Sequence, residues 1–433
     1  MPRIRSLLLL LPLVACSGSE SGESGPDAST PSGDGGIDAP QVPEMGIVSV
    51  VVSGYPGIGM PPQYFANASV VFYEPDFATT TVVKTDAMGR ASATIKKGSF
   101  VAVVNPMNYI QVHAAFANPG DTLRFGPDIV ASQPNGSVRV TWPPRVITGY
   151  TTYYYVYTSC GYSSETTGTS VTLPLDTACS TQPFDIVVTS RRSSQGVTGV
   201  MSRRGVMATG QLVTVNLADN GGAWQTATTT SVPLTNMPST TDHTGSCTAV
   251  QQLGTLAFNS DGGSASSTSC AMRLLPEATS TWAVDASFYK DSNDRFAIQM
   301  RQTMPQTSIT PIDGANHLPW ITSFAYDKAT RRVTWSSDAD APFDASALRI
   351  DVSGPRYMVW RIVAPNGLPK TFQIPALPAE LAMWDLGPSD DARASLVNMD
   401  FVGVSPAEFM AHDLDQEDGF VDKPRRGATA RMP

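Results

Sequence analysis

The stretch TTTVVKTDAMGRASATIKKGSFVAVVN, residues 79–105, contains three short β-branched runs separated by two turns. Val, Ile, Thr and Phe favour strands, whereas Asp and Gly favour turns, Gly because it adopts positive φ without steric strain. The turns are expected at 85–90 and 97–98. Two similar runs precede this stretch, so one all-β unit is expected to begin near residue 46. Its strands are predicted at 47–52, 68–73, 79–84, 91–95 and 99–104.

The two turns of this unit also carry a motif. T-D-x-x-G is present at 85–89, and G-x-[YF]-x-[VL] is matched by Gly98 and Phe100, with Ala102 where the pattern has a larger apolar residue. The unit therefore resembles the carboxypeptidase-regulatory-like or transthyretin-like β-sandwich. The resemblance implies a non-catalytic module of secreted or surface proteins, here assigned to residues 46–129.

The rest of the chain has the same character. Short β-branched and aromatic runs are separated by Gly, Pro, Asn and Asp, and long stretches of helical period are missing, as in all-β proteins. We therefore expect tandem β-sandwich domains after a signal peptide and a disordered tether. Their boundaries are predicted at 46–129, 130–217, 218–312 and 313–410, followed by a flexible tail at 411–433.

Finer expectations follow within these domains. A strand pair around residues 119–121 is expected to complete the first domain, and loops are expected at 226–246 and 259–269 in the third, with a strand near 253–258. The second and fourth domains resemble immunoglobulin or fibronectin domains. Both contain a Val-Thr-Trp triplet, at 140–142 and 333–335, which suggests a weak internal repeat.

The first fifteen residues have the three parts of an export signal: two arginines, an apolar run, and small residues before a cysteine. The apolar run has roughly eight residues, too few to span a bilayer, which takes about twenty. Leu13-Val14-Ala15-Cys16 resembles the lipobox of bacterial lipoproteins. In that family the signal, here residues 1–15, is removed and the cysteine, here Cys16, is acylated. An ordinary signal peptide that happens to contain a cysteine is the alternative.

Residues 16–45 contain the lipobox cysteine and a linker rich in Ser, Gly, Pro and Asp. Such a segment buries too little apolar surface to offset its ordering entropy, so we interpret it as a disordered tether. Ser17 follows the cysteine where lipoproteins of inner membranes often carry Asp. The resemblance therefore implies a cell-envelope location, with the outer membrane favoured over the inner.

Composition and cysteine number narrow the function further. The net charge of −9 argues against binding nucleic acid, which requires basic patches. Apart from Cys16, four cysteines remain, an even number that indicates disulfides in an oxidising compartment. Local pairing is expected because each pair lies within one predicted domain, although other connectivities stay open. A four-cysteine zinc site is the alternative, but close C-x2-4-C pairs are missing. The expected disulfides are Cys160–Cys179 and Cys247–Cys270.

Two polar segments are candidates for chemistry. Asp242-His243-Thr244-Gly245-Ser246 places a carboxylate, an imidazole and a hydroxyl close together, but a triad is assembled from separate segments and G-x-S-x-G is absent. The acidic run 413–419 resembles half of a calcium loop, with its Gly one place late and no Glu at the end. A polar loop and a solvated acidic tail are the preferred interpretations. We therefore predict no catalytic residue, no cofactor and no metal site.

The run Tyr153-Tyr154-Tyr155-Val156-Tyr157 is the most unusual local feature. Alternate residues of a strand point to opposite faces, so Tyr153, Tyr155 and Tyr157 share one face. Exposed rings there would suit a sugar or a protein partner, whereas packing under a neighbouring domain is the alternative. These three tyrosines form the predicted binding face.

Together, these features predict a membrane-anchored lipoprotein of the cell envelope that serves as a non-catalytic structural, adhesive or binding module. Its expected partners are the membrane, through lipid on Cys16, and an envelope protein or glycan. A carbohydrate-binding surface protein and an accessory to an envelope hydrolase are the alternatives. The hydrolase alternative requires at least two of Asp242, His243, Ser246 and the acidic run to converge on a pocket.

Overall fold

Among the residues that it describes, the computed structural model has thirty β-strands and three short 3-10 helices, so the predicted all-β class is confirmed. Residues 1–43, which include the predicted signal, Cys16 and most of the tether, lie outside the described residues. The described residues are 44–54, 63–78, 80–105, 111–126, 136–147, 149–160, 163–175, 179, 182–192, 195–208, 212–226, 228–238, 246–253, 256–264, 268–274, 281–290, 295–305, 309–354, 357–401, 403–404 and 425–432.

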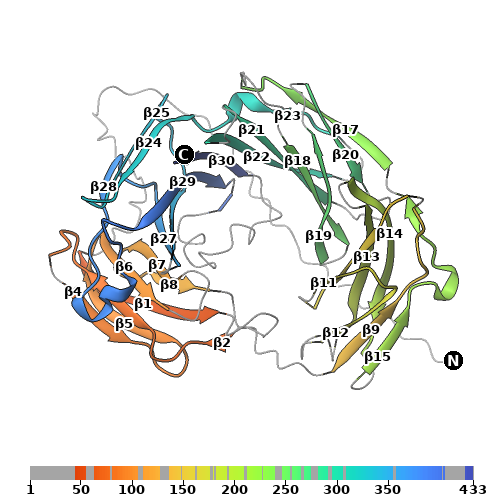
Figure 1. Ribbon diagram of the computed structural model, residues 1–433, viewed down its shortest axis with the longest axis horizontal. Coiled ribbons are helices and arrows are strands. Elements are labelled where there is room, and N and C mark those ends of the chain that lie inside the picture. The colour runs from red at the N-terminus through yellow and green to blue at the C-terminus, as the bar shows by residue number, and fades with distance from the viewer. Residues whose placement is uncertain are drawn as a thin grey trace, which may run out of the picture. The chain divides into compact units, whose positions relative to one another are not determined.

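The largest sheet has 12 strands drawn from both halves of the chain. Across the sheet they are, in order, β19 (Leu256–Ser264), β18 (Ser246–Leu253), β21 (Thr281–Tyr289), β22 (Phe296–Pro305), β30 (Arg425–Arg431), β29 (Asp391–Phe401), β26 (Ala345–Ser353), β27 (Met358–Pro365), β7 (Val112–Ala117), β6 (Ser99–Val104), β3 (Ser69–Tyr73) and β4 (Thr80–Lys84). Neighbours are antiparallel except that β27 runs parallel to β7 (Figure 1).

The N-terminal sandwich closes over one end of this sheet. A second sheet covers β3, β4, β6 and β7, and consists of β1 (Met45–Gly54), β2 (Gln63–Tyr64), β5 (Arg90–Lys96) and β8 (Thr122–Phe125). Buried β-branched and aromatic side chains from both sheets form one core, because alternate strand positions point inward. The strands expected between residues 47 and 104 are confirmed.

The T-D-x-x-G motif forms the expected turn. The carboxylate of Asp86 accepts hydrogen bonds from the backbone N–H groups of Met88 (2.8 Å) and Arg90 (2.9 Å). Gly89 has a φ of +65°, and a Cβ there would lie 2.2 Å from the carbonyl oxygen of Val52. Only glycine therefore satisfies both the backbone angle and the space at this position.

The strand pair around residues 119–121 is present, but its members do not pair with each other. After the turn the chain crosses to the opposite sheet, where β8 runs parallel to β1, while β7 pairs with β6. Leu123 and Phe125 of β8 are buried in the core. The crossing places these two apolar residues between the sheets, which the local pattern alone does not indicate.

The second sandwich packs a five-stranded sheet on a three-stranded one around a shared core. The disulfide Cys160–Cys179 lies in that core, and its Cα atoms are 5.9 Å apart, so the predicted pairing is confirmed. The larger sheet contains β11 (Ser163–Thr166), β10 (Thr152–Thr158), β13 (Phe184–Arg192), β14 (Gln195–Val206) and β16 (Gln225–Thr226). The smaller contains β12 (Ser170–Pro174), β9 (Ser137–Thr141) and β15 (Leu212–Asn216), followed by the helix η1 (Asp219–Gly221).

The third predicted domain, residues 218–312, contains a disulfide of its own. Cys247 of β18 is bonded to Cys270 of β20 (Ser269–Leu274), with Cα atoms 6.1 Å apart. This pairing confirms the second expected disulfide. Because all four cysteines are now in disulfides, the four-cysteine zinc alternative is wrong. A small sheet places β20 beside β17 (Thr228–Thr235), which in turn pairs with β23 (Ile312–Asp313), and the helix η2 (Gly314–Asn316) follows.

Both loop predictions in this segment need correction. The expected loop at 226–246 contains β17. Its sequence TTTSVPLT alternates polar and apolar residues near its end, so that Val232 and Leu234 pack in the core. The expected loop at 259–269 begins inside β19, which continues to Ser264. The strand expected near 253–258 is confirmed for residues 256–258, which begin β19, whereas Leu253 ends the antiparallel neighbour β18.

The last sandwich shares its core with the first. A sheet of β24 (Ile321–Asp327), β25 (Arg332–Ser337) and β28 (Thr371–Gln373), followed by the helix η3 (Ala379–Trp384), adjoins the core that β26, β27 and β29 line. Trp360 of β27 is fully buried there, together with Tyr73 and Phe100 of the N-terminal strands. One hydrophobic core therefore includes residues from both ends of the predicted domain array. The exact domain boundaries stay predictions.

The tail prediction is wrong for residues 425–431. They form β30, which pairs with β22 on one side and β29 on the other. Ala428 and Ala430 are fully buried, and Arg426 forms an ion pair with Asp400 (2.5 Å). The sequence RRGATAR has no large apolar residue, so neither hydrophobicity nor β-propensity marks it as a central strand.

The two Val-Thr-Trp triplets have matching surroundings. Val140 and Val333 are fully buried, and each Trp lies beside an antiparallel partner strand, β12 or β28. The backbone N–H of Trp142 donates to the backbone carbonyl of Thr169 (3.1 Å), and that of Trp335 donates to the backbone carbonyl of Lys370 (3.0 Å). In both cases the acceptor is the residue just before the partner strand. This shared geometry supports the internal repeat.

Candidate functional site

The tyrosine strand has the alternation that its sequence predicts. Tyr154 and Val156 of β10 are buried in the core of the second sandwich, whereas Tyr153, Tyr155 and Tyr157 are half-buried on its other face. The rings of Tyr155 and Tyr157 are stacked, with centroids 6.5 Å apart and planes 20° apart. The three residues of the predicted binding face therefore lie together at a partly exposed surface.

One arginine of the neighbouring strand β13, Arg191, completes this surface. Arg191 pairs in register with Tyr153, and its guanidinium carbon lies 4.6 Å from the centroid of the Tyr155 ring. Arg192 pairs with Thr152 and therefore points to the opposite side of the sheet, where its guanidinium carbon lies 3.9 Å from the centroid of the exposed Tyr150 ring. These are cation–π geometries, in which the ring orients the guanidinium. We call Tyr153, Tyr155, Tyr157 and Arg191 the aromatic–arginine face.

The phenol groups of Tyr155 and Tyr157 stay protonated at physiological pH. A hydrogen bond to Glu165, on the adjacent strand β11, raises the pKa of Tyr155 above its ordinary value. Burial raises the pKa of Tyr157. Tyr155 and Tyr157 therefore present neutral hydroxyl groups beside the positively charged guanidinium of Arg191.

Most of β13 is covered on the side of the sheet that carries the three tyrosines. Val187 and Thr189 of β13 pair with Tyr157 and Tyr155, so they share the same side of the sheet, yet both are fully buried. The accessible surface is consequently a strip along β10 and the end of β13. The three tyrosines are therefore partly exposed, as a binding face requires, and partly packed against the protein, as the alternative interpretation expects.

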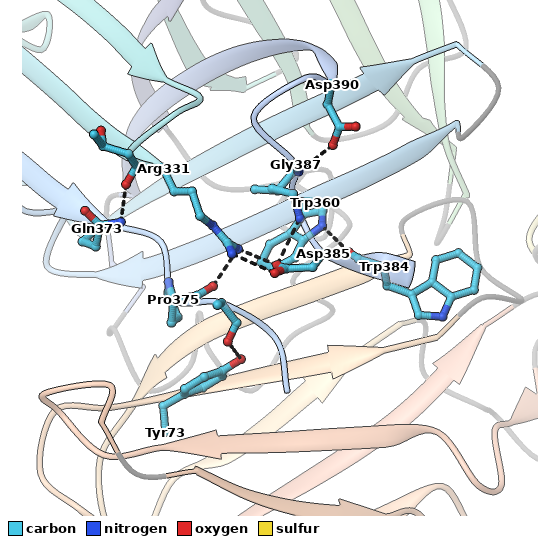
Figure 2. Close-up of polar contacts among 12 residues, drawn as sticks. Tyr73, Arg331, Trp360, Gln373, Pro375, Trp384, Asp385, Gly387 and Asp390 are labelled. Atoms are coloured by element: carbon cyan, nitrogen blue, oxygen red, sulfur yellow. Dashed lines mark hydrogen bonds and ion pairs between the residues drawn. The ribbon is translucent and has the colours of Figure 1, made fainter. Parts of the chain in front are cut away.

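A second polar cluster surrounds Arg331 in the last sandwich (Figure 2). Its guanidinium donates two hydrogen bonds to the carboxylate of Asp385, at 2.8 and 2.6 Å, and one to the carbonyl of Pro375 at 2.8 Å. The indole of Trp360 donates to the carbonyl of Trp384 at 3.0 Å. These donors hold the segment after β28 against β27.

The same cluster reaches the N-terminal sandwich through Tyr73. Its hydroxyl donates to the carbonyl of Ala376 at 3.0 Å, and burial raises its pKa well above the ordinary value. Tyr73 is therefore a neutral donor, not a proton carrier, at physiological pH. Because the contacts of Arg331 and Tyr73 are directed at the protein itself, we assign this cluster a structural role.

Most of the histidine and acidic candidates for chemistry lie outside the described residues. His113 is buried on β7, edge-on to Phe125, and His317 follows η2 with its Nδ1 within hydrogen-bond distance of the Leu318 carbonyl. His243 with Asp242, His412 and the acidic run 413–419 lie outside the described residues, as does the side chain of Ser246. Among the described residues, no group of three or more His, Cys, Asp or Glu side chains is arranged to hold a metal ion.

Sequence reasoning missed the arginine of the aromatic–arginine face. Arg191 lies more than thirty positions along the chain from Tyr153 and reaches it only through the register between β10 and β13. The sequence offers one local signal: the apolar run IVVTSRR ends in two adjacent arginines. This pattern indicates a strand with an exposed end, but it does not indicate which strand pairs with it.

The comparisons with known proteins assign no family. No family model matches the sequence, and no curated protein matches it. Among solved structures, the Bacillus anthracis TIE protein is matched over 62% of this chain and 50% of its own, at 9% identity and a TM-score of 0.15. The pilus adhesin SpaC of Lactobacillus rhamnosus GG is matched over 75% of this chain and 43% of its own, with the same identity and TM-score. The chain thus spans half or less of either structure, and scores this low support no conclusion about function.

No helix in the described part of the chain is long and apolar enough to cross a membrane.

Proposed function

We propose that the protein is a lipid-anchored protein of the cell envelope that acts as a non-catalytic binding module. The anchor is proposed at Cys16, in the tetrad Leu13-Val14-Ala15-Cys16, with the outer membrane favoured by Ser17. The two disulfides support export, because disulfides persist in oxidising compartments. With Cys16 acylated, all five cysteines of the chain have a role.

The anchor leads to a first prediction. Cys16→Ala should move the protein from the membrane fraction to the soluble fraction and abolish metabolic labelling with palmitate, since several acyl chains on one residue supply the whole attachment. Cell fractionation and labelling measure both effects. Ser17→Ala is the matched control and should stay membrane-bound. Retention of Cys16→Ala in the membrane fraction at the wild-type level would rule out this anchor.

The observation that carries the binding proposal is the aromatic–arginine face. Tyr and Arg are enriched at the energetic centres of protein interfaces, where a large rigid ring and a guanidinium contribute contact area and directed hydrogen bonds. Arg191 lies over one side of the Tyr155 ring, so that side cannot stack on a sugar. A protein partner therefore fits this face better than a glycan does.

A second prediction tests the face. Tyr155→Ala and Arg191→Ala should each reduce capture of the partner from detergent-solubilised envelopes about tenfold or more, because interface hot spots contribute about 2 kcal/mol or more. Quantitative mass spectrometry of the captured proteins measures the loss. Arg204→Ala serves as the control because this arginine is exposed on β14 and its contact with Asp185, at 3.9 Å, is loose. Equal capture by all four proteins would refute the binding face.

A further inference from the structure

A cavity of about 310 Å³ opens in the last sandwich, beside the end of β25 and the loop that follows β27. This volume lies at the lower end of the range for small-molecule sites, about 300–1,000 Å³. Leu318, Trp335 and Leu368 are buried side chains that line it. The lining residues come from separate segments of the chain, which the fold brings to one place.

The aromatic wall of the cavity is fixed in position. The Trp335 indole N–H is shared between the carbonyls of Leu368 (3.2 Å) and Pro369 (3.1 Å). The Phe343 ring lies 6.3 Å from that of Trp335, and the backbone of Gly367 packs so closely on Phe343 that a Cβ would come within 2.5 Å of the ring. The rings and the loop therefore hold one another, and the cavity is formed before any ligand enters.

A buried amide supplies a directed donor to the cavity. Asn398 lines it and is 3% exposed. Its Oδ1 accepts a hydrogen bond from the hydroxyl of Ser346 (2.7 Å), and that hydroxyl in turn accepts one from the Leu368 N–H (2.9 Å). These two bonds fix the orientation of the amide. Within the described part of the chain, no residue accepts a hydrogen bond from its Nδ2, which is left to donate to a ligand.

The rim carries one positive and one negative group. Lys370 and Asp340 form an ion pair of 2.5 Å with side chains 51% and 88% exposed, and the ammonium lies 5.9 Å from the centroid of the Trp335 ring. The pair offers both donors and acceptors, while its charges cancel. Asn366 and Ser337 add further polar groups to the lining.

We propose that this cavity binds a small neutral carbohydrate of one or two sugar rings. A sugar has an apolar C–H surface that packs on aromatic rings, and hydroxyl groups that both donate and accept hydrogen bonds. The cavity offers both features, and its lining carries no net charge to attract an acidic sugar. The inference goes beyond the proposed function, because the cavity shares no residue with the aromatic–arginine face.

The proposal is tested by calorimetric titration of the full chain with neutral mono- and disaccharides, acidic sugars and free amino acids. At least one neutral sugar should bind, and Asp340→Asn should weaken that binding about tenfold, since a hydrogen bond to a charged acceptor is lost. Phe343→Ala should weaken it by a similar factor. Asp351→Asn, which alters an exposed ion pair outside the cavity, is the control and should bind as wild type does.

Three results would overturn the proposal: no neutral sugar binds at millimolar concentration, acidic sugars or amino acids bind instead, or binding is the same in wild type and Asp340→Asn. Circular dichroism of each variant separates loss of the site from loss of the fold. Because Asp340 lines a cavity that shares no residue with the aromatic–arginine face, partner capture by Asp340→Asn should be unchanged. Failure of the sugar site and failure of the protein-binding face are therefore distinguishable.

Discussion

Replacing Trp360 with alanine should lower the free energy of unfolding by about 3–5 kcal/mol, the range for a large aromatic removed from a core. The ring is fully buried in the core that the first and last sandwiches share, so its loss leaves a cavity lined by residues from both. The substitution also removes the indole donor that reaches the Trp384 carbonyl, and with it a contact of η3.

Urea denaturation followed by circular dichroism measures the effect of Trp360→Ala. Tyr357→Ala is the matched control, because this aromatic residue lies three positions earlier and is 63% exposed. It should change the free energy of unfolding by less than about 0.5 kcal/mol, as surface substitutions usually do. Equal effects of the two substitutions would contradict a shared core around β27.

Asp385→Asn should destabilise the protein by about 2–3 kcal/mol. The substitution leaves the guanidinium of Arg331, whose side chain is 15% exposed, without its negative partner. An unpaired charge in such a place is costly, because the surrounding protein cannot replace the hydration it has lost. The expected destabilisation is no larger than the lower end of the range for a fully buried ion pair, about 3–5 kcal/mol, because Asp385 is itself 19% exposed.

Asp351→Asn provides the matched comparison for Asp385→Asn. It breaks the ion pair with Arg349, which has the same chemistry and a similar length but is 36–42% exposed. Exposed pairs contribute about 0–1 kcal/mol, and high salt screens them. The same denaturation assay applies to both variants. A loss from Asp385→Asn no greater than that from Asp351→Asn would show that the Arg331 cluster does not hold the segment after β28.

The sequence was most informative where local chemistry decides structure. The turn at Asp86–Gly89 requires a carboxylate that caps its own backbone and a residue that tolerates positive φ, and both requirements are readable in a short motif. Runs of β-branched residues likewise identified the strands of the first sandwich. The two disulfides followed from an even cysteine number and from pairs that lie close in sequence.

The sequence was least informative where long-range pairing decides structure. β30 is a central strand made of Gly, Ala, Thr and Arg, and its partners rather than its own side chains place it in the sheet. β8 leaves its neighbour β7 to run beside β1. The shared core around Trp360 depends on the parallel pairing of β7 with β27, which are separated by more than two hundred residues.

The binding face shows the same division. Alternation along β10 correctly placed Tyr153, Tyr155 and Tyr157 on one side, because it depends only on strand geometry. The position of Arg191 depends on register with another strand and could not be predicted. The cavity beside β25 was not predicted either, since Trp335, Phe343 and Asn398 come together only through the fold.

Site-specific photocrosslinking in intact cells tests the central claim most directly. A photoreactive amino acid at position 153, on the aromatic–arginine face, should give one discrete adduct with an envelope protein, and Arg191→Ala should abolish it. The same probe at position 383, where Met383 is 66% exposed, should give no such adduct. An identical set of adducts from the two positions, or none from position 153, would contradict a protein-binding role for this face.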